Sequence, residues 1–141
     1  MKKKKFLITG GTGFIGSNIS QFLVNKNHNV KILDNNFRGN INKIKSFRKK
    51  IKFVKGDIRN KKLLDKVLKN TDAVIHLAYI NGTKYFYSKP ILVLDVAIKG
   101  TLNIIEACIK NKVKELYLAS SSEVYQTPNK IPTDENEPLK I

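Results

Sequence analysis

Phe6-Leu-Ile-Thr-Gly-Gly-Thr-Gly-Phe-Ile-Gly16 joins a short apolar run to a helical pattern through closely spaced glycines. Gly11, Gly13 and Gly16 follow the spacing G-x-G-x-x-G. The first glycine lets the chain turn sharply out of a strand, the second lets backbone approach a pyrophosphate, and the third lets a helix pack close to the sheet. The N-terminus of that helix would offer N–H groups and a partial positive charge to phosphates. The stretch therefore predicts a dinucleotide-binding loop, and the alternative is a glycine-rich turn without a ligand.

Beyond this loop, short apolar runs alternate with helical patterns. Strands are expected at Phe6–Thr9, Val30–Leu33, Ile51–Val54, Ala73–Leu77 and Leu116–Ala119. Helices are expected at Phe14–Asn25, at Ile41–Phe47, after a capping Asn60 and at Ile91–Ile109, with loops at Ala78–Lys89 and from Thr127 onward. This alternation predicts an α/β fold, a Rossmann-type doubly wound parallel sheet of strand order 3-2-1-4-5 that is incomplete at the C-terminus.

The segment Ile91–Ile109 is apolar on nearly every side, which predicts a helix buried all round. Its second covering surface could come from a protein partner or from a C-terminal part of the same chain. The first of these alternatives predicts a homodimer through residues 91–109.

Composition limits the function classes. The 141 residues carry a net charge of +16, but Lys dominates the basic residues and the lysines are dispersed. Lys, Asn and Ile are residues that an AT-rich genome over-produces, so no nucleic-acid partner is expected. No apolar run approaches the ~20 residues of a membrane span, and the single Cys108 permits no disulfide framework. We expect a cytoplasmic protein of one domain, with no membrane contact and no metal.

Asp34 directly follows the second expected strand, 18 residues beyond Gly16. A carboxylate there can accept both hydroxyls of the adenosine ribose and would repel a 2′-phosphate, which favours NAD over NADP. Two alternatives stay open. Asp34 could instead cap the N–H of Asn36 or Phe37, and Arg38 could hold a 2′-phosphate.

Two further strand ends carry weaker signals. In Gly56-Asp57-Ile58, after the third strand, a carboxylate can reach an adenine amino group. In His76-Leu-Ala-Tyr79, after the fourth strand, the small Ala78 lets backbone lie along a cofactor. His76 itself is interpreted as a core or supporting histidine rather than a catalyst.

The sequence resembles the extended short-chain dehydrogenase/reductase family, and within it the sugar-nucleotide epimerases, dehydratases and decarboxylases. The matching segments follow one another at the family's spacing: TGGTGFIGSN (9–18), KILD (31–34), GDIRN (56–60), VIHLA (74–78), KGTLNIIEAC (99–108) and LASSSEVY (118–125). The resemblance implies that residues 1–141 are the N-terminal portion of an NAD-binding domain, that the substrate-binding domain is absent, and that the substrate of the complete enzyme is a nucleotide sugar.

The resemblance also implies which residues hold NAD. They are Gly10, Gly13, Phe14, Ile15 and Gly16 at the pyrophosphate, Asp34 at the adenosine ribose with Asn35 and Arg38 beside it, Asp57 and Ile58 at the adenine, Leu77 and Ala78 along the dinucleotide, and Ser120 beside the nicotinamide.

For catalysis, the resemblance matches Ser121 to the residue that hydrogen-bonds the sugar hydroxyl oxidised at C4. Ser122 and Glu123 match positions where decarboxylases and dehydratases carry extra catalytic groups, and the Ser-Glu pair is similar to the uronic-acid decarboxylases. The alternative for Glu123 is a solvated loop carboxylate. Two positions depart from the family: Ala97, where Asn is common, and Gln126, where Gly is usual.

The family's acid–base pair is a Tyr-x-x-x-Lys on a helix after the serine strand, where the ammonium lowers the pKa of the phenol. Here that spacing occurs only at Tyr85–Lys89, before the serine strand, and we interpret it as coincidence. No tyrosine follows Tyr125. We therefore expect this chain to bind NAD without turnover. The alternative is a stand-alone NAD-binding or sensor module, against which Ser121 argues.

Overall fold

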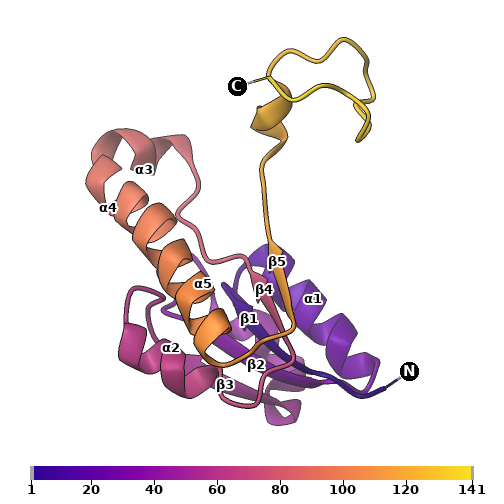
Figure 1. Cartoon of the computed structure of the whole chain (residues 1–141), viewed down its shortest axis with the longest axis vertical. Coiled ribbons are helices and arrows are strands. Elements are labelled where there is room, and N and C mark those ends of the chain that lie inside the picture. The colour runs from indigo at the N-terminus through magenta and orange to yellow at the C-terminus, as the bar shows by residue number, and fades with distance from the viewer. Residues whose placement is uncertain (1, 141) are drawn as a thin grey trace.

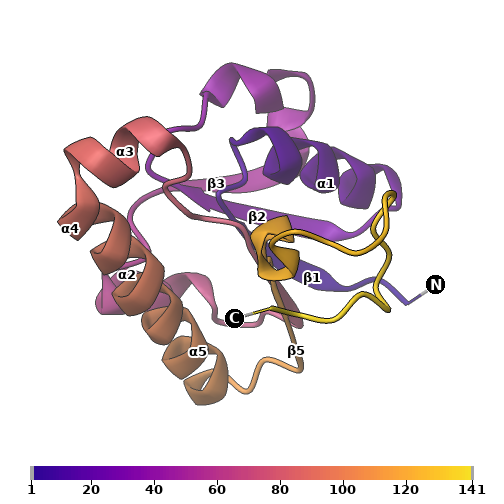
Figure 2. The same cartoon turned by 90° about the horizontal axis from the view of Figure 1, so that it is seen from above.

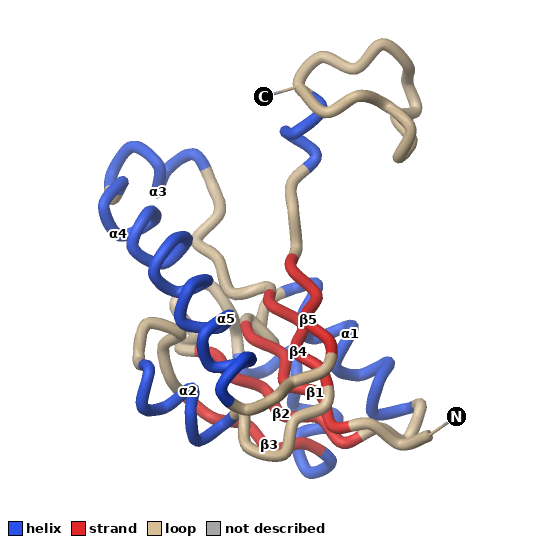
Figure 3. Tube along the Cα trace, in the orientation of Figure 1, coloured by secondary structure: helices blue, strands red, loops and turns tan. Residues whose placement is uncertain are grey.

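A five-stranded parallel sheet organises the computed structural model, which describes residues 2–140 (Figures 1 and 3). Its strands are β1 (Lys5–Thr9), β2 (Asn29–Asp34), β3 (Ile51–Lys55), β4 (Ala73–His76) and β5 (Glu115–Leu118). The strand order is β3-β2-β1-β4-β5 and every neighbouring pair is parallel. The predicted strands and their order are confirmed, with boundaries shifted by at most one residue.

Helices cover both faces of this sheet. One face carries α1 (Phe14–Asn25) and the 3₁₀ helix η1 (Ile41–Lys50). The other carries α2 (Lys61–Val67) and a long helix made of α4 (Pro90–Leu94), the π-helical segment η2 (Asp95–Gly100) and α5 (Thr101–Lys110). Alternation along the strands divides the core accordingly, because successive side chains point to opposite faces.

Strand β1 shows this division most simply. Leu7 packs into the core under α2 and α5 together with Leu64 and Ile104. Its neighbour Ile8 packs into the other core with Ile44 of η1. The doubly wound fold follows from this arrangement of buried apolar residues on both sides of one sheet.

The long helix is present where it was expected, but the prediction that it is buried all round is wrong for this chain. Only one side packs on the core, through residues such as Val93, Val96 and Ile104. The outer side is an apolar stripe in which every side chain is more than half exposed: Ile91, Leu94, Ile98, Leu102 and Ile109. A single helix layer over a sheet leaves its outer side uncovered, whatever its hydrophobicity.

The predicted loop 78–89 is also partly wrong, because it contains the short helix α3 (Thr83–Ser88). Gly82 precedes this helix with a φ of +117°, a conformation that side chains disfavour. The Tyr85 ring of α3 packs at a tilt against the Phe37 ring, with ring centroids 5.5 Å apart. The helix is six residues long, too short to give a periodic signal, and it is stabilised by contacts with a loop distant in sequence.

Beyond β5 the chain leaves the body of the sheet, as Figures 1 and 2 show. It forms the 3₁₀ helix η3 (Ser122–Tyr125) and then irregular structure, as expected from Thr127 onward. Within residues 2–140 no helix is both long and apolar enough to cross a lipid bilayer.

Candidate nucleotide-binding site

A pocket lies at the carboxyl ends of β1 to β4, where the segments that follow each strand come together. In doubly wound sheets this edge, at the point where the strand order reverses, is where ligands bind. Residues of α4 and η2 (Leu92 and Val96) close one side. The pocket brings together these predicted cofactor residues: Gly10, Gly13, Asp34, Asn35, Arg38, Asp57, Ile58, Leu77 and Ala78.

The glycine loop is shaped by a backbone crossing between β1 and β4. Gly10 has a φ of +71°, and a Cβ on it would lie 2.8 Å from the carbonyl carbon of Leu77. The sharp turn predicted for Gly11 therefore occurs one residue earlier. Gly11 instead packs on Ile32, where a Cβ would lie 2.5 Å from Cγ2. A Cβ on Gly16 would collide with the Gly10 carbonyl oxygen, which agrees with the close packing predicted for it.

Phe14 and Ile15 begin α1 just beyond Gly13, and both side chains are exposed outside the pocket. Gly13 is the N-cap residue and provides no side-chain cap. Any part that Phe14 and Ile15 play toward a phosphate must therefore run through backbone N–H groups at the start of a 12-residue helix.

Asp34 is buried at the end of β2, with its carboxylate fixed by two backbone donors. Thr12 N donates to Oδ2 at 3.0 Å, and Asn36 N donates to Oδ1 at 2.7 Å. The capping of Asn36 left open by the sequence thus occurs, while the N–H of Phe37 donates to the Asn35 side chain at 2.9 Å. A carboxylate has about four acceptor positions, so these two bonds do not exhaust it.

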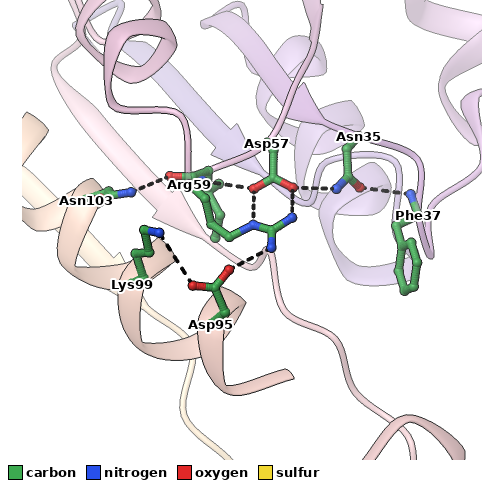
Figure 4. Close-up of polar contacts among 8 residues, drawn as sticks. Asn35, Phe37, Asp57, Arg59, Asp95, Lys99 and Asn103 are labelled. Atoms are coloured by element: carbon green, nitrogen blue, oxygen red, sulfur yellow. Dashed lines mark hydrogen bonds and ion pairs between the residues drawn. The ribbon is translucent and has the colours of Figure 1, made fainter. Parts of the chain in front are cut away.

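Asp57 and Arg59 form the centre of a polar network beside the pocket (Figure 4). Asp57 Oδ1 accepts from Arg59 Nε at 2.9 Å, and Oδ2 accepts from Arg59 Nη2 at 2.8 Å. Arg59 Nη1 donates to Asp95 Oδ2 at 2.7 Å. The hydrogen bond from Arg59 lowers the pKa of Asp57 and keeps it ionised. Sequence reasoning missed Arg59; its signal was an arginine two residues after the carboxylate that it holds.

His76 supports the pocket from within the core. Thr9 Oγ1 accepts the N–H groups of Leu77 and Ala78, each at 3.2 Å, so its own hydroxyl donates to His76 Nδ1 at 2.7 Å. That leaves the ring proton on Nε2, which donates to Thr101 Oγ1 at 3.2 Å. Burial lowers the pKa of His76 to about 4. His76 is therefore a neutral, buried residue that orients Thr9, and Thr9 holds the bend at Leu77–Ala78; the sequence interpretation was a core or supporting histidine.

Arg38 lies at the pocket but is engaged with the segment around α3. Its guanidinium donates to the Asn81 carbonyl and lies 5.1 Å from the centroid of the Tyr85 ring. Lys89 Nζ lies 5.8 Å from the Phe37 ring. The side chains of Tyr85 and Lys89 thus pack against Arg38 and Phe37, two residues that line the pocket.

The serine segment after β5 is a further part of the predicted site that the structure does not bring to the pocket. Ser120, Ser121, Ser122 and Glu123 are exposed, and none lines the pocket. Ser121 Oγ accepts the Glu123 N–H at 3.2 Å and caps η3. Within residues 2–140 no group of three or more His, Cys, Asp or Glu side chains is placed to hold a metal ion.

The family model described as GDP-mannose 4,6 dehydratase matches residues 7–140. The chain belongs to this family. The expected placement among the extended short-chain dehydrogenase/reductases that act on sugar nucleotides is confirmed.

Members of the family with different reactions resemble the chain to similar degrees. A UDP-N-acetyl-alpha-D-glucosaminuronate decarboxylase of Bacillus cytotoxicus is 38% identical over 87% of this chain and 38% of its own length. A UDP-glucose 4-epimerase of Bifidobacterium longum, solved with NAD+ and UDP, aligns with a TM-score of 0.87 and 31% identity over 96% of this chain and 42% of its own. A dTDP-glucose 4,6-dehydratase of Streptomyces venezuelae, solved with NAD bound, aligns with a TM-score of 0.86 and 26% identity over 96% of this chain and 45% of its own. The chain thus spans less than half of each relative.

Proposed function

We propose that this chain is the NAD(H)-binding portion of a nucleotide-sugar epimerase, dehydratase or decarboxylase that acts by transient oxidation of the sugar at C4. The observation that carries the proposal is the pocket at the carboxyl edge of the sheet, where the glycine loop, Asp34 and Asp57 converge. Family membership supports it, because the relatives solved with NAD bound share this fold over nearly the whole chain.

In this proposal the pyrophosphate lies over Gly10 and Gly13 at the N-terminus of α1, which favours negative charge. The adenosine ribose hydroxyls donate to Asp34, and the adenine lies beside Asp57 and Ile58. Leu77 and Ala78 follow the dinucleotide toward Ser120.

NAD is favoured over NADP by the charge at Asp34. Two backbone N–H groups fix its carboxylate toward the pocket, and a 2′-phosphate there would meet a buried negative charge. Arg38, the residue that could have attracted a 2′-phosphate, is engaged with Asn81 and Tyr85.

The chemistry proposed for the complete enzyme is removal of a hydride from C4 and of a proton from its hydroxyl. NAD supplies the hydride acceptor when bound. Ser121 orients the hydroxyl, and a base of tuned pKa must take the proton. The 141 residues hold no Tyr-x-x-x-Lys after Ser121, so we expect these residues alone to bind cofactor without turnover.

Calorimetric titration of the folded chain with NAD+, NADH and NADP+ tests the proposal. We expect NAD+ and NADH to bind more tightly than NADP+. Tighter binding of NADP+ would mean that Arg38 binds the 2′-phosphate and that Asp34 does not select the cofactor. No binding of any of the three would overturn the proposal in favour of a different role for this fold.

We further propose that the complete protein self-associates through the apolar stripe of the long helix. Its members recur every three or four residues from Ile91 to Leu102, and Ile109 follows two helical turns later on the outer side, so two copies can pack stripe against stripe. Charge complementarity favours a second copy of this chain as the occupant. In an antiparallel pair with a two-fold axis near Leu102, Lys99 of one copy would lie beside Glu106 of the other, and both side chains are exposed.

Sedimentation equilibrium tests this association. Ile98→Glu should shift the chain from dimer to monomer, because it buries a charge against an apolar partner face. Phe22→Glu, at an exposed position on α1, is the control and should leave the dimer intact. A monomer at all concentrations before any substitution would contradict the proposal.

A further inference from the structure

The loop that follows β3 is attached to the long helix through a partly buried arginine. Arg59 lies between two carboxylates, with Nε and Nη2 on Asp57 and Nη1 on Asp95 of η2 (Figure 4). Asp57 and Arg59 line the pocket, whereas Asp95 does not. Arg59 therefore links a pocket carboxylate to Asp95, which lies 36 positions beyond Arg59 in the sequence and outside the pocket.

The bonds to Asp57 determine how its carboxylate is turned. Oδ1 accepts Arg59 N and Nε, each at 2.9 Å, and Oδ2 accepts Arg59 Nη2 at 2.8 Å. The fourth donor is Asn35 Nδ2 at 3.2 Å, the longest of the four and on the exposed side. A carboxylate has about four acceptor positions. The position that a ligand amino group can take over is therefore the one that faces Asn35.

The same helix also holds the residue between Asp57 and Arg59. Asn103 Nδ2 donates to the Ile58 carbonyl at 3.2 Å, and Ile58 packs so closely on Gly100 that a Cβ there would collide with its side chain. Ile58 is almost fully buried. The backbone of the loop is thus fixed by η2 and α5, so that Arg59 has a rigid frame from which to orient Asp57.

Exposure separates this link from the Lys61–Glu106 ion pair, which also reaches the long helix. The side chains of Asp57, Arg59 and Asp95 are 28%, 31% and 34% exposed. Those of Lys61 and Glu106, which join α2 to α5, are 62% and 61% exposed. Exposed pairs hold geometry weakly, whereas a bidentate arginine fork fixes the plane of a carboxylate.

We propose that Arg59 is a positioning residue for recognition of the adenine base, with Asp95 as its anchor: the guanidinium turns the Asp57 carboxylate so that one acceptor position meets the 6-amino group. This inference rests on the proposed binding of NAD. According to this inference, the preference for adenine over other bases depends on the Arg59–Asp95 ion pair, in which Asp95 lies outside the pocket.

Nicotinamide hypoxanthine dinucleotide is the probe, because it carries an oxygen in place of the 6-amino group and a hydrogen on the adjacent N1, and otherwise has the structure of NAD+. Calorimetry gives the ratio of the two dissociation constants for each variant. A hydrogen bond to a charged group corresponds to roughly a tenfold preference or more for NAD+. In Asp95→Asn we expect that ratio to fall to within about threefold of unity, because a neutral amide holds the guanidinium less firmly.

Three controls make the result specific. Glu106→Gln removes an ion pair to the same helix away from the pocket and should keep the full ratio. Asp95→Glu restores the charge and should recover most of the preference. Should Asp95→Asn not fold, as judged by its thermal transition, Arg59→Lys replaces it, because an ammonium cannot reproduce the two-sided fork.

The outcomes separate this inference from the proposed function. Failure of the unsubstituted chain to bind either dinucleotide overturns the proposed function. A preference for NAD+ that Asp95→Asn leaves unchanged, or a chain that binds both dinucleotides equally, overturns the role of Arg59 while NAD binding stands. A purely structural role for Asp95 would weaken both dinucleotides by the same factor and keep their ratio.

Discussion

The adenine side of the pocket and the serine segment are both parts of the site expected from sequence, yet they differ in how completely the chain fixes them. Asp34 is held by the backbone N–H groups of Thr12 and Asn36, and Asp57 by the backbone and the guanidinium of Arg59. Ser120 to Glu123 are exposed beyond the last strand and make a single local cap. Side chains positioned by a central strand and its neighbours are organised by this chain alone. The side chains of the serine segment, beyond the edge strand β5, need contacts other than those in this structure to be fixed in a binding site.

Among substitutions at the adenine side of the pocket, the largest loss of stability is expected at Gly10. Gly10→Val places a β-branched side chain at φ +71° and against the Leu77 backbone. We expect unfolding free energy to fall by roughly 2–5 kcal/mol, from left-handed strain and overpacking together. Urea unfolding measures it. Gly13→Ala is the matched control: its Cβ would meet only the Gly10 carbonyl at 3.1 Å, so stability should change less while NAD affinity falls.

The next effect comes from the neutral His76. Its pKa is about 4 in the folded chain and near 6.5 when unfolded, so the unfolded state binds the proton more readily between these values. Stability from this residue is complete above pH 6.5 and is lost as pH falls toward 4. The loss reaches about 3 kcal/mol.

Urea unfolding at pH 7, 6, 5 and 4.5 checks this dependence, and His76→Gln should flatten it because an amide does not titrate in that range. A wild-type stability that stays constant from pH 7 to 4.5 would contradict the burial argument.

These two effects rest on features that the sequence predicted to different extents. The parallel sheet and its order were predictable because β1, β2 and β4 are short apolar runs that have to be buried on both faces. The glycine spacing predicted the loop but not that the positive φ falls on Gly10, because that depends on the backbone of Leu77 crossing from β4.

The features that sequence reasoning missed are contacts between distant segments. Arg59 reads as an ordinary surface arginine until Asp95, 36 residues later, is placed beside it. Helix α3 has no periodicity of its own and is held by the packing of the Tyr85 ring against the Phe37 ring. Local patterns cannot report such pairs, because the partner's position is set by the fold.

Asp34→Ala sharpens the comparison within the pocket. The substitution removes charged-group hydrogen bonds proposed for the ribose hydroxyls, and we expect NAD+ binding to weaken by roughly 1–3 kcal/mol. Because Thr12 N and Asn36 N lose their acceptor as well, stability should also fall. Titrations at a temperature well below the transition separate the two effects. An unchanged affinity would leave Asp34 as a capping residue alone.

The smallest effect is expected at Ser121, and it tests the serine segment directly. Ser121 Oγ accepts one exposed N–H, that of Glu123, and the residue lies outside the pocket. Loss of such an exposed cap changes stability by at most a few tenths of a kcal/mol in this setting, since water replaces the bond. Ser121→Ala should therefore leave both the unfolding free energy and the NAD+ dissociation constant of this chain unchanged within about twofold. A marked loss of NAD+ affinity would mean that the serine segment folds onto the cofactor when it binds, and that the 141 residues organise more of the site than their contacts indicate. In a complete enzyme the same substitution should instead lower kcat, because Ser121 would then orient the sugar hydroxyl that is oxidised.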